Sequence, residues 1–196
     1  MTIMITKTDA AERQLNTAIR LFFENRDHLS SYALAVASRE VTDGVIKHRR
    51  PELFQRELAR VGDPQKVRLS YWEQIWDMVK PEFYKNKDLI NLHNRWQNFL
   101  KHAKTDPDAE IEPFKTKLLV LAIIFAIKNY FLLTQDLTIE MKTFFVWFAV
   151  AEPQLLKSAP EDVTTNKAIA EMRSYISGDP YDRNTLENIY TAMTYV

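Results

Sequence analysis

Apolar residues recur every three or four positions through most of the chain, which is the spacing of amphipathic α-helices. In the segment 8–25 they fall on one helical face, at Leu15, Ala18, Ile19, Phe22 and Phe23. Alternation with period two, the pattern of a half-buried strand, is scarce. The three glycines are too few for the tight turns of an antiparallel sheet protein. The pattern therefore predicts an all-α fold.

Eight prolines lie between the apolar stretches and mark where we expect helices to end. Four or five longer helices should make a bundle, centred on 8–25, 30–48, 87–104 and 113–135. Further helices are predicted over 51–61, 71–79, 136–151, 166–176 and 184–192. The length of 196 residues suits a single domain over 1–196, with a core bundle at about 8–150 and more polar helices at about 160–196.

Local features add three predictions to this outline. Thr8 or Asp9 should cap the first helix, because both side chains accept hydrogen bonds from helix amides. Arg39 and Asp43 are four residues apart and should pair on one side of the second helix. Gly44 lies inside that helix, where glycine costs about 1 kcal/mol relative to alanine. A tight contact or a bend is expected there.

The strongest apolar run, 118–133, reads LLVLAIIFAIKNYFLL. Its uncharged part is only ten residues long before Lys128 and Asn129 interrupt it, whereas a membrane span needs about 20 mostly apolar residues. We interpret it as a buried helix and expect no membrane partner. The first residues lack a basic region and a cleavage site, and the chain has no cysteine, so we expect a cytoplasmic protein.

Charge is balanced over the whole chain but not along it. The formal net charge is zero, which disfavours generic DNA binding. Residues 47–68 nevertheless hold seven Lys and Arg against three acidic residues, and 85–104 hold five against one. This asymmetry predicts a local basic surface or, as the alternative, ordinary solvated helix faces.

Several classes of site lack their sequence motifs. Without cysteine there is no thiolate metal site, and no Glu precedes a His by three residues as in di-iron bundles. Glycine-rich phosphate loops and the Gly-x-Ser-x-Gly elbow are also missing. We therefore expect no metal and no cofactor.

The helix predicted over 87–104 carries the densest set of polar groups. At 100° per residue, its polar stripe falls within about 60° of arc and comprises Asn91, Arg95, Asn98 and His102. An apolar stripe lies beside it, formed by Leu92, Trp96, Phe99 and Ala103. An arginine can neutralise a phosphodiester, and a histidine can accept the proton of an RNA 2′-hydroxyl. The alternative is that these side chains hold neighbouring helices by hydrogen bonds.

The spacing of Arg95 and His102, Arg-x6-His on a late helix of a small bundle, resembles the signature of the HEPN superfamily. The resemblance implies an all-α homodimer that brings its two motifs together across the interface. It also implies a metal-independent RNase of the kind found in bacterial toxin–antitoxin, abortive-infection and RNA-processing systems. The residue after the family's arginine is usually polar, where this chain has Trp96.

A second resemblance is to uncharacterised bacterial all-helical proteins, and it is carried by residues 17–30, 33–41 and 98–109. The last stretch reads NFLKHAKTDPDA, and those proteins share an N-F-x-K-H-A…D-P motif. This resemblance implies no activity. It favours Asn98 together with the Lys101-His102 pair over Arg95 as functional residues.

Two functions follow as hypotheses. In the first, Arg95, Asn98, Lys101 and His102 form a catalytic site for RNA in a homodimeric HEPN-like protein. In the second, the chain is a non-catalytic helical module that binds a protein or a small ligand. The segment 98–102 then serves as a clamp that pins the loop at 105–108.

Overall fold

The structure is a computed structural model that describes residues 4–61, 87–101, 110–155, 163–176 and 178–194. All regular secondary structure in these ranges is helical, which confirms the predicted all-α fold. The α-helices are α1 (Lys7–Phe23), α2 (His28–Val61), α5 (Lys87–Lys101), α6 (Thr116–Thr134), α7 (Ile139–Ala151), α8 (Val163–Tyr175) and α9 (Arg183–Thr194), with a short 3-10 helix η1 (Pro153–Leu155). The helix predicted over 71–79 lies outside the described residues.

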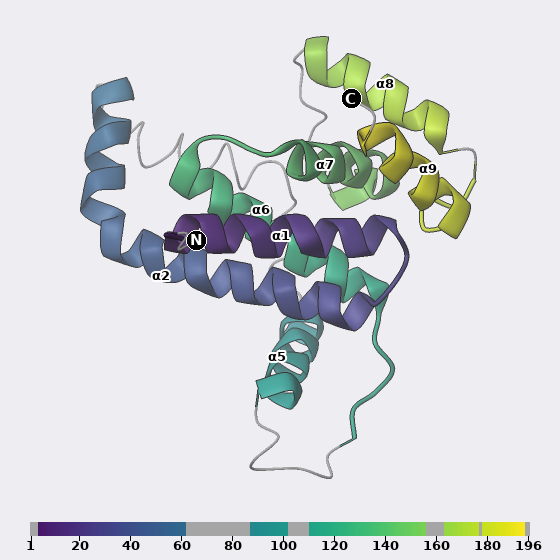
Figure 1. The fold of residues 1–196 in the computed structure, drawn as a ribbon, viewed down its shortest axis with the longest axis horizontal. Helices are drawn as coiled ribbons and strands as arrows, with labels where there is room; N and C mark the ends of the chain where they lie inside the picture. The colour runs from purple at the N-terminus through teal and green to yellow at the C-terminus, as the bar shows by residue number, and fades with distance from the viewer. Residues whose placement is uncertain (1–3, 62–86, 102–109, 156–162, 177, 195–196) are drawn as a thin grey trace.

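Helices α1 and α2 form an antiparallel hairpin, and α6 packs along it (Figure 1). Helix α7 lies against α1 and carries α8 on its other side, while α9 contacts α1, α7 and α8. Helix α5 projects away from this body and contacts it mainly through α2 (Figure 1). Its isolation leaves much of the α5 surface uncovered by the other described helices.

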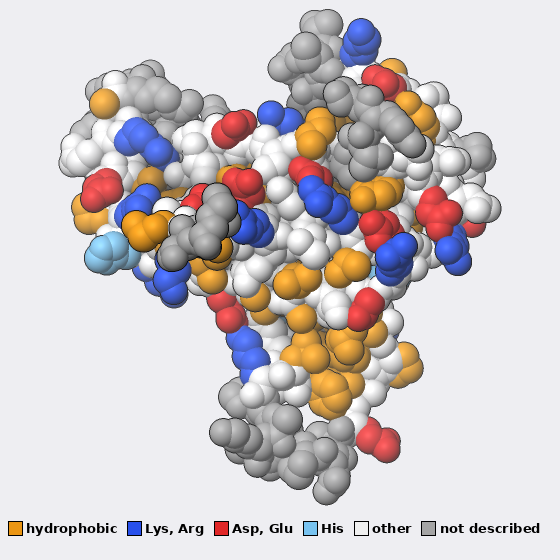
Figure 2. Space-filling view, viewed as in Figure 1, with side chains coloured by type: hydrophobic (Ala, Val, Ile, Leu, Met, Phe, Trp, Pro, Cys, Tyr) orange, Lys and Arg blue, Asp and Glu red, His pale blue; other side chains and the backbone are white. Residues whose placement is uncertain are grey.

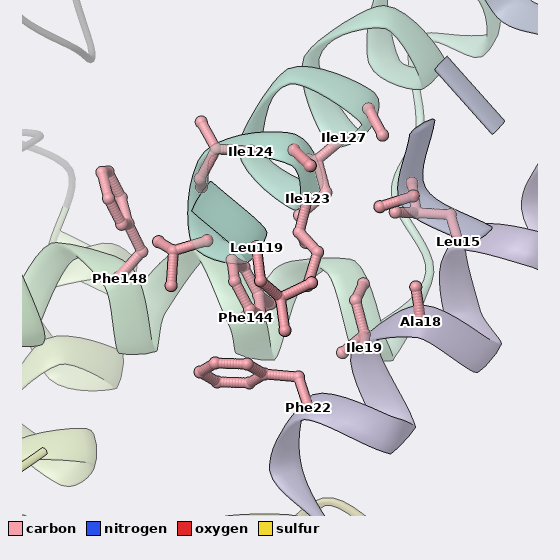
Figure 3. Packing of buried hydrophobic residues seen from close by; sticks show 14 of the residues in the cluster. Leu15, Ala18, Ile19, Phe22, Leu119, Ile123, Ile124, Ile127, Phe144 and Phe148 are labelled. Carbon is pink, nitrogen blue, oxygen red and sulfur yellow. The ribbon is translucent and has the colours of Figure 1, made fainter. Parts of the chain in front are cut away.

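The core is built from apolar side chains of α1, α6 and α7, which meet as shown in Figure 3. The five residues predicted for the buried face of the first helix are all fully buried. Phe22 packs edge-on against Phe144 and Trp147, with ring centroids 5.1 and 4.7 Å apart. Each large aromatic side chain buried in this way contributes about 2–3 kcal/mol.

Helix α6 corresponds to the strongest apolar run and is buried on most of its surface. By length and composition alone it would qualify as a membrane span, but 67% of its apolar window is buried inside the protein. It contacts α1, α2 and α7. The interpretation of 118–133 as a core helix is therefore confirmed.

The predicted division between helices 30–48 and 51–61 is wrong, because α2 runs without interruption through Pro51. The proline removes one backbone hydrogen bond and its ring crowds the preceding turn, which bends a helix without necessarily ending it. The ribbon of α2 turns sharply toward its C-terminal end (Figure 1). Pro51 was correctly predicted to mark a structural change, but the change is in the direction of α2 and does not end the helix.

The predicted cap of the first helix is also displaced. Thr6, not Thr8, is the N-cap, and its hydroxyl accepts a hydrogen bond from the Asp9 amide at 3.1 Å. The Asp9 carboxylate accepts from the Thr6 amide in return, at 2.9 Å. Asp9 is thus the third residue of a capping box rather than the cap.

Candidate functional site

Helix α5 is amphipathic in the way its sequence predicted. Leu92 and Trp96 are buried, and Phe99 is partly buried against the core. The Trp96 ring packs edge-on against Phe114, with centroids 5.0 Å apart, and against Phe99 at 5.8 Å. This apolar stripe fixes the rotation of α5 about its own axis. It thereby decides which polar side chains face outward.

The described members of the predicted polar stripe, Asn91, Arg95 and Asn98, are exposed. Arg95 forms an ion pair with Glu112 at 2.5 Å, and Lys101 forms one with Glu40 of α2. His102 lies outside the described residues. Ion pairs this exposed typically contribute about 0–1 kcal/mol. Arg95 and Lys101 are therefore cations whose carboxylate partners a phosphate could replace at little cost.

A histidine that the sequence did not single out, His93, anchors α5 to α2. Its Nδ1 lies 2.8 Å from the Tyr32 hydroxyl, and its Nε2 lies 3.3 Å from Nη1 of Arg39. Because an arginine can only donate, Nε2 must accept, and the ring proton then sits on Nδ1. Nδ1–H donates to the Tyr32 oxygen, whose own proton is donated to the His93 carbonyl at 3.1 Å. All three polar groups are satisfied when the imidazole is neutral.

The surroundings keep His93 neutral. Burial, followed by the positive charges of Arg39 and Lys101, lowers the pKa of His93 to about 4. Burial also raises the pKa of the Tyr32 hydroxyl. His93 is thus uncharged at neutral pH and a weak base, so it serves to orient Arg39 and to pin α5.

The contacts of Arg39 extend the arrangement to α6. Its guanidinium lies 3.8 Å from a carboxylate oxygen of Asp43, as the i,i+4 spacing predicted, and 5.2 Å from the Phe125 ring centre. Asn129 donates a hydrogen bond to Asp43 at 2.7 Å. Burial, then repulsion from Arg39, lowers the pKa of Lys128 to about 7, although Asp43 opposes this shift.

We refer to Arg39, Asp43, His93, Lys128 and Asn129 as the α2–α5–α6 polar cluster. Sequence reasoning missed it as a unit because its members come from three helices. One signal was available: Lys128 and Asn129 interrupt an otherwise apolar helix, and buried polar groups require partners. Spacing alone could not identify those partners.

A basic surface lies at the bend of α2. Its consecutive residues Lys47, His48, Arg49 and Arg50 are all exposed. Figure 2 shows Lys and Arg side chains gathered over this end of α2. Residues 47–50 of the predicted basic segment are therefore solvent-facing.

Metal donors do not converge in the described ranges: no three His, Asp or Glu side chains come together there. Comparisons with family models, with curated proteins and with solved structures gave no match to this chain. Its function must therefore be argued from its own residues.

Proposed function

We propose that this chain is a HEPN-like protein that binds single-stranded RNA and cleaves it without a metal. The observation that supports the proposal best is the exposure of Arg95 and Asn98 on α5, with Lys101 at the end of the same helix. His102 follows Lys101 directly in the sequence. The proposed roles use the ordinary chemistry of these side chains.

In the proposed reaction His102 accepts the proton of a 2′-hydroxyl, and the 2′-oxygen attacks the adjacent phosphorus. The bond from phosphorus to the 5′-oxygen breaks, leaving a 2′,3′-cyclic phosphate and a 5′-hydroxyl. Arg95 and Lys101 stabilise the extra negative charge on the phosphorane oxygens, and Asn98 orients the phosphate by hydrogen bonding.

RNA binding is supported by the cations that lie beyond α5. Arg39 contacts His93 of α5, and the exposed residues 47–50 follow on the same helix as Arg39. From Arg39 to Arg49 the rise along α2 is roughly 15 Å at 1.5 Å per residue. Phosphates of one extended strand could therefore meet both groups, and their attraction should weaken with salt.

We further propose that the protein is a homodimer that associates through the uncovered surface of α5. Hydrophobic side chains gather over the lower part of the molecule, around α5 and the start of α2 (Figure 2). Ile90 and Leu100 on α5 are 43% and 37% exposed, and Leu29 at the start of α2 is 38% exposed. Apolar side chains that gather on a surface often mark a protein interface.

The test is to incubate the purified protein with single-stranded RNA in EDTA and to compare it with His102→Ala. Arg95→Ala should lower the rate as well, whereas Arg173→Ala, which removes an exposed cation from α8, should leave it unchanged. Equal background cleavage by wild type and His102→Ala would refute the catalytic proposal.

A non-catalytic helical module is the second candidate, and it is favoured by the contacts that hold α5 against the neighbouring segments. Lys101 with Glu40, Arg95 with Glu112, and His93 with Tyr32 all link α5 to neighbouring segments. In that case Lys101→Ala and His102→Ala act chiefly on thermal stability. RNA cleavage by the wild type would rule this candidate out, and an unchanged melting temperature of His102→Ala would also count against it.

A further inference from the structure

A groove separates the first turn of α1 from the middle of α2. Its volume is about 580 Å³, which is within the range of small-molecule sites. Val41, Gly44 and Val45 of α2 line it with little polar surface. Lys7 approaches from the α1 side, and Arg49 approaches from α2. Of the described residues proposed for RNA cleavage, Arg95, Asn98 and Lys101, none lines this groove.

Gly44 is the unusual residue of the groove. The sequence suggested a tight contact or a bend, but a Cβ atom added at this position would meet no atom of the described residues within 4 Å beyond the local backbone of α2. Packing therefore does not require glycine here, and the backbone is that of an ordinary helix. Glycine is unfavourable inside a helix, so its presence in open space calls for another reason. What it preserves is the depth of the groove, since any side chain would project into it.

The charges around the groove favour an anion. Lys7 and Arg49 are exposed cations, and His48 adds a planar imidazole ring. Glu40 is the acidic residue among the lining residues, and it is paired with Lys101. The groove therefore offers positive side chains around an apolar floor in which Gly44 leaves open space between Val41 and Val45.

We propose that this groove binds one nucleotide, with its phosphate held by Lys7 and Arg49 and its base lying flat over Gly44. A guanidinium and an ammonium are suitable donors for a phosphate, and His48 presents a ring on which a base can stack. The inference rests on the proposed RNA binding but not on cleavage. A free nucleotide and a nucleotide within RNA share this chemistry, so both belong in the test.

The experiment measures binding of AMP and of a single-stranded tetraribonucleotide by titration calorimetry, with inorganic phosphate for comparison. Gly44→Leu should weaken the binding of AMP, the tetranucleotide or both by at least about tenfold, because its side chain fills the groove. The same change should raise Tm by roughly 2–4 °C, since leucine favours a helix over glycine. Weaker binding by a more stable protein cannot be attributed to unfolding.

Gly44→Ala is the matched control, because it gains helix propensity while adding only one carbon. It should raise Tm similarly and bind within about threefold of the wild type. Arg49→Ala should weaken binding about tenfold, and Arg173→Ala on α8 should not.

Binding of AMP alone would identify a free nucleotide as the ligand, and tighter binding of the tetranucleotide would identify RNA. Phosphate binding as tight as that of AMP would overturn the role of the base. Undiminished binding by Gly44→Leu, or no binding of either nucleotide probe by the wild type, would overturn the proposal. If the wild type binds AMP but cleaves no RNA, the RNase proposal is refuted and the proposed nucleotide site still stands.

Discussion

Replacing His93 by glutamine should flatten the pH dependence of stability in acid. In the folded protein the pKa of His93 is about 4, which is about 2.5 below its ordinary value of 6.5. Each pKa unit corresponds to about 1.36 kcal/mol, so the neutral imidazole contributes on the order of 3 kcal/mol. Glutamine retains a hydrogen-bonding side chain but does not titrate.

The sign follows from proton binding. Between pH 4 and 6.5 the unfolded chain binds a proton at His93 that the folded protein does not. The contribution to stability is therefore complete above pH 6.5 and is lost as the pH falls toward 4. Carboxylates titrate in the same window, so the informative quantity is the difference between wild type and His93→Gln.

The assay is urea unfolding at pH values from 7.5 to 4.5, with the free energy of unfolding extrapolated to water at each pH. The difference between wild type and His93→Gln should shrink by about 2–3 kcal/mol across this range. His48→Gln, at an exposed position on α2, is the control and should follow the wild type. Parallel curves for wild type and His93→Gln would refute the conclusion that Tyr32, Arg39 and burial hold this imidazole neutral.

The remaining predictions concern the core and the surface. Burial raises the pKa of Glu140, but the hydrogen bond and the positive charge of Arg20, together with hydrogen bonds from the Glu140 amide and Thr138, outweigh it and leave that pKa lowered. Arg20→Ala should therefore cost about 1–3 kcal/mol near pH 7 and progressively less in acid, as measured by denaturant unfolding. Trp147→Phe removes the indole donor to the Pro180 carbonyl, 3.2 Å away, and should lower the free energy of unfolding by about 1–2 kcal/mol in the same assay. Phe144→Ala removes a fully buried ring from the core and should lower it by about 3–5 kcal/mol. Leu100→Asp on α5 should convert the proposed dimer to a monomer, as measured by light scattering. Ile139→Asp, at an exposed position on α7, is the control and should leave the dimer intact. A wild type that is monomeric at all concentrations would refute the homodimer.

The helices could be predicted where one face is buried, because burial of one face makes apolar residues recur every three or four positions in the sequence. In α1 every apolar position of the 3.6-residue pattern is buried, so the sequence records the packing directly. Helix α6 was recognised as a core helix because two polar residues interrupt its apolar run. The continuity of α2 was missed because a proline within a helix and a proline between helices look the same along the chain.

The candidate site was less accessible to sequence reasoning. Spacing on one helix separated a polar stripe with Arg95 and Asn98 from an apolar stripe with Trp96, and the structure shows the first two exposed and Trp96 buried. The same reasoning could not find the partners of His93, because Tyr32 is 61 residues and Arg39 is 54 residues away in the chain. Contacts between helices depend on how the helices pack, and a single helix does not encode that geometry. Gly44 is an intermediate case. The sequence showed that this glycine lowers helix stability, whereas the proposed reason for it, the groove beside α1, could be seen only in the structure.

The proposed RNA cleavage is tested most directly by the substrate's own 2′-hydroxyl. One single-stranded oligonucleotide is prepared as RNA and as the same sequence with 2′-deoxy sugars, and both are incubated with the protein in EDTA. We predict that only the RNA is cleaved, that its products carry 2′,3′-cyclic phosphate and 5′-hydroxyl ends, and that His102→Ala leaves it intact. Cleavage of both substrates, or of neither, would contradict the proposal that this chain is a metal-independent RNase.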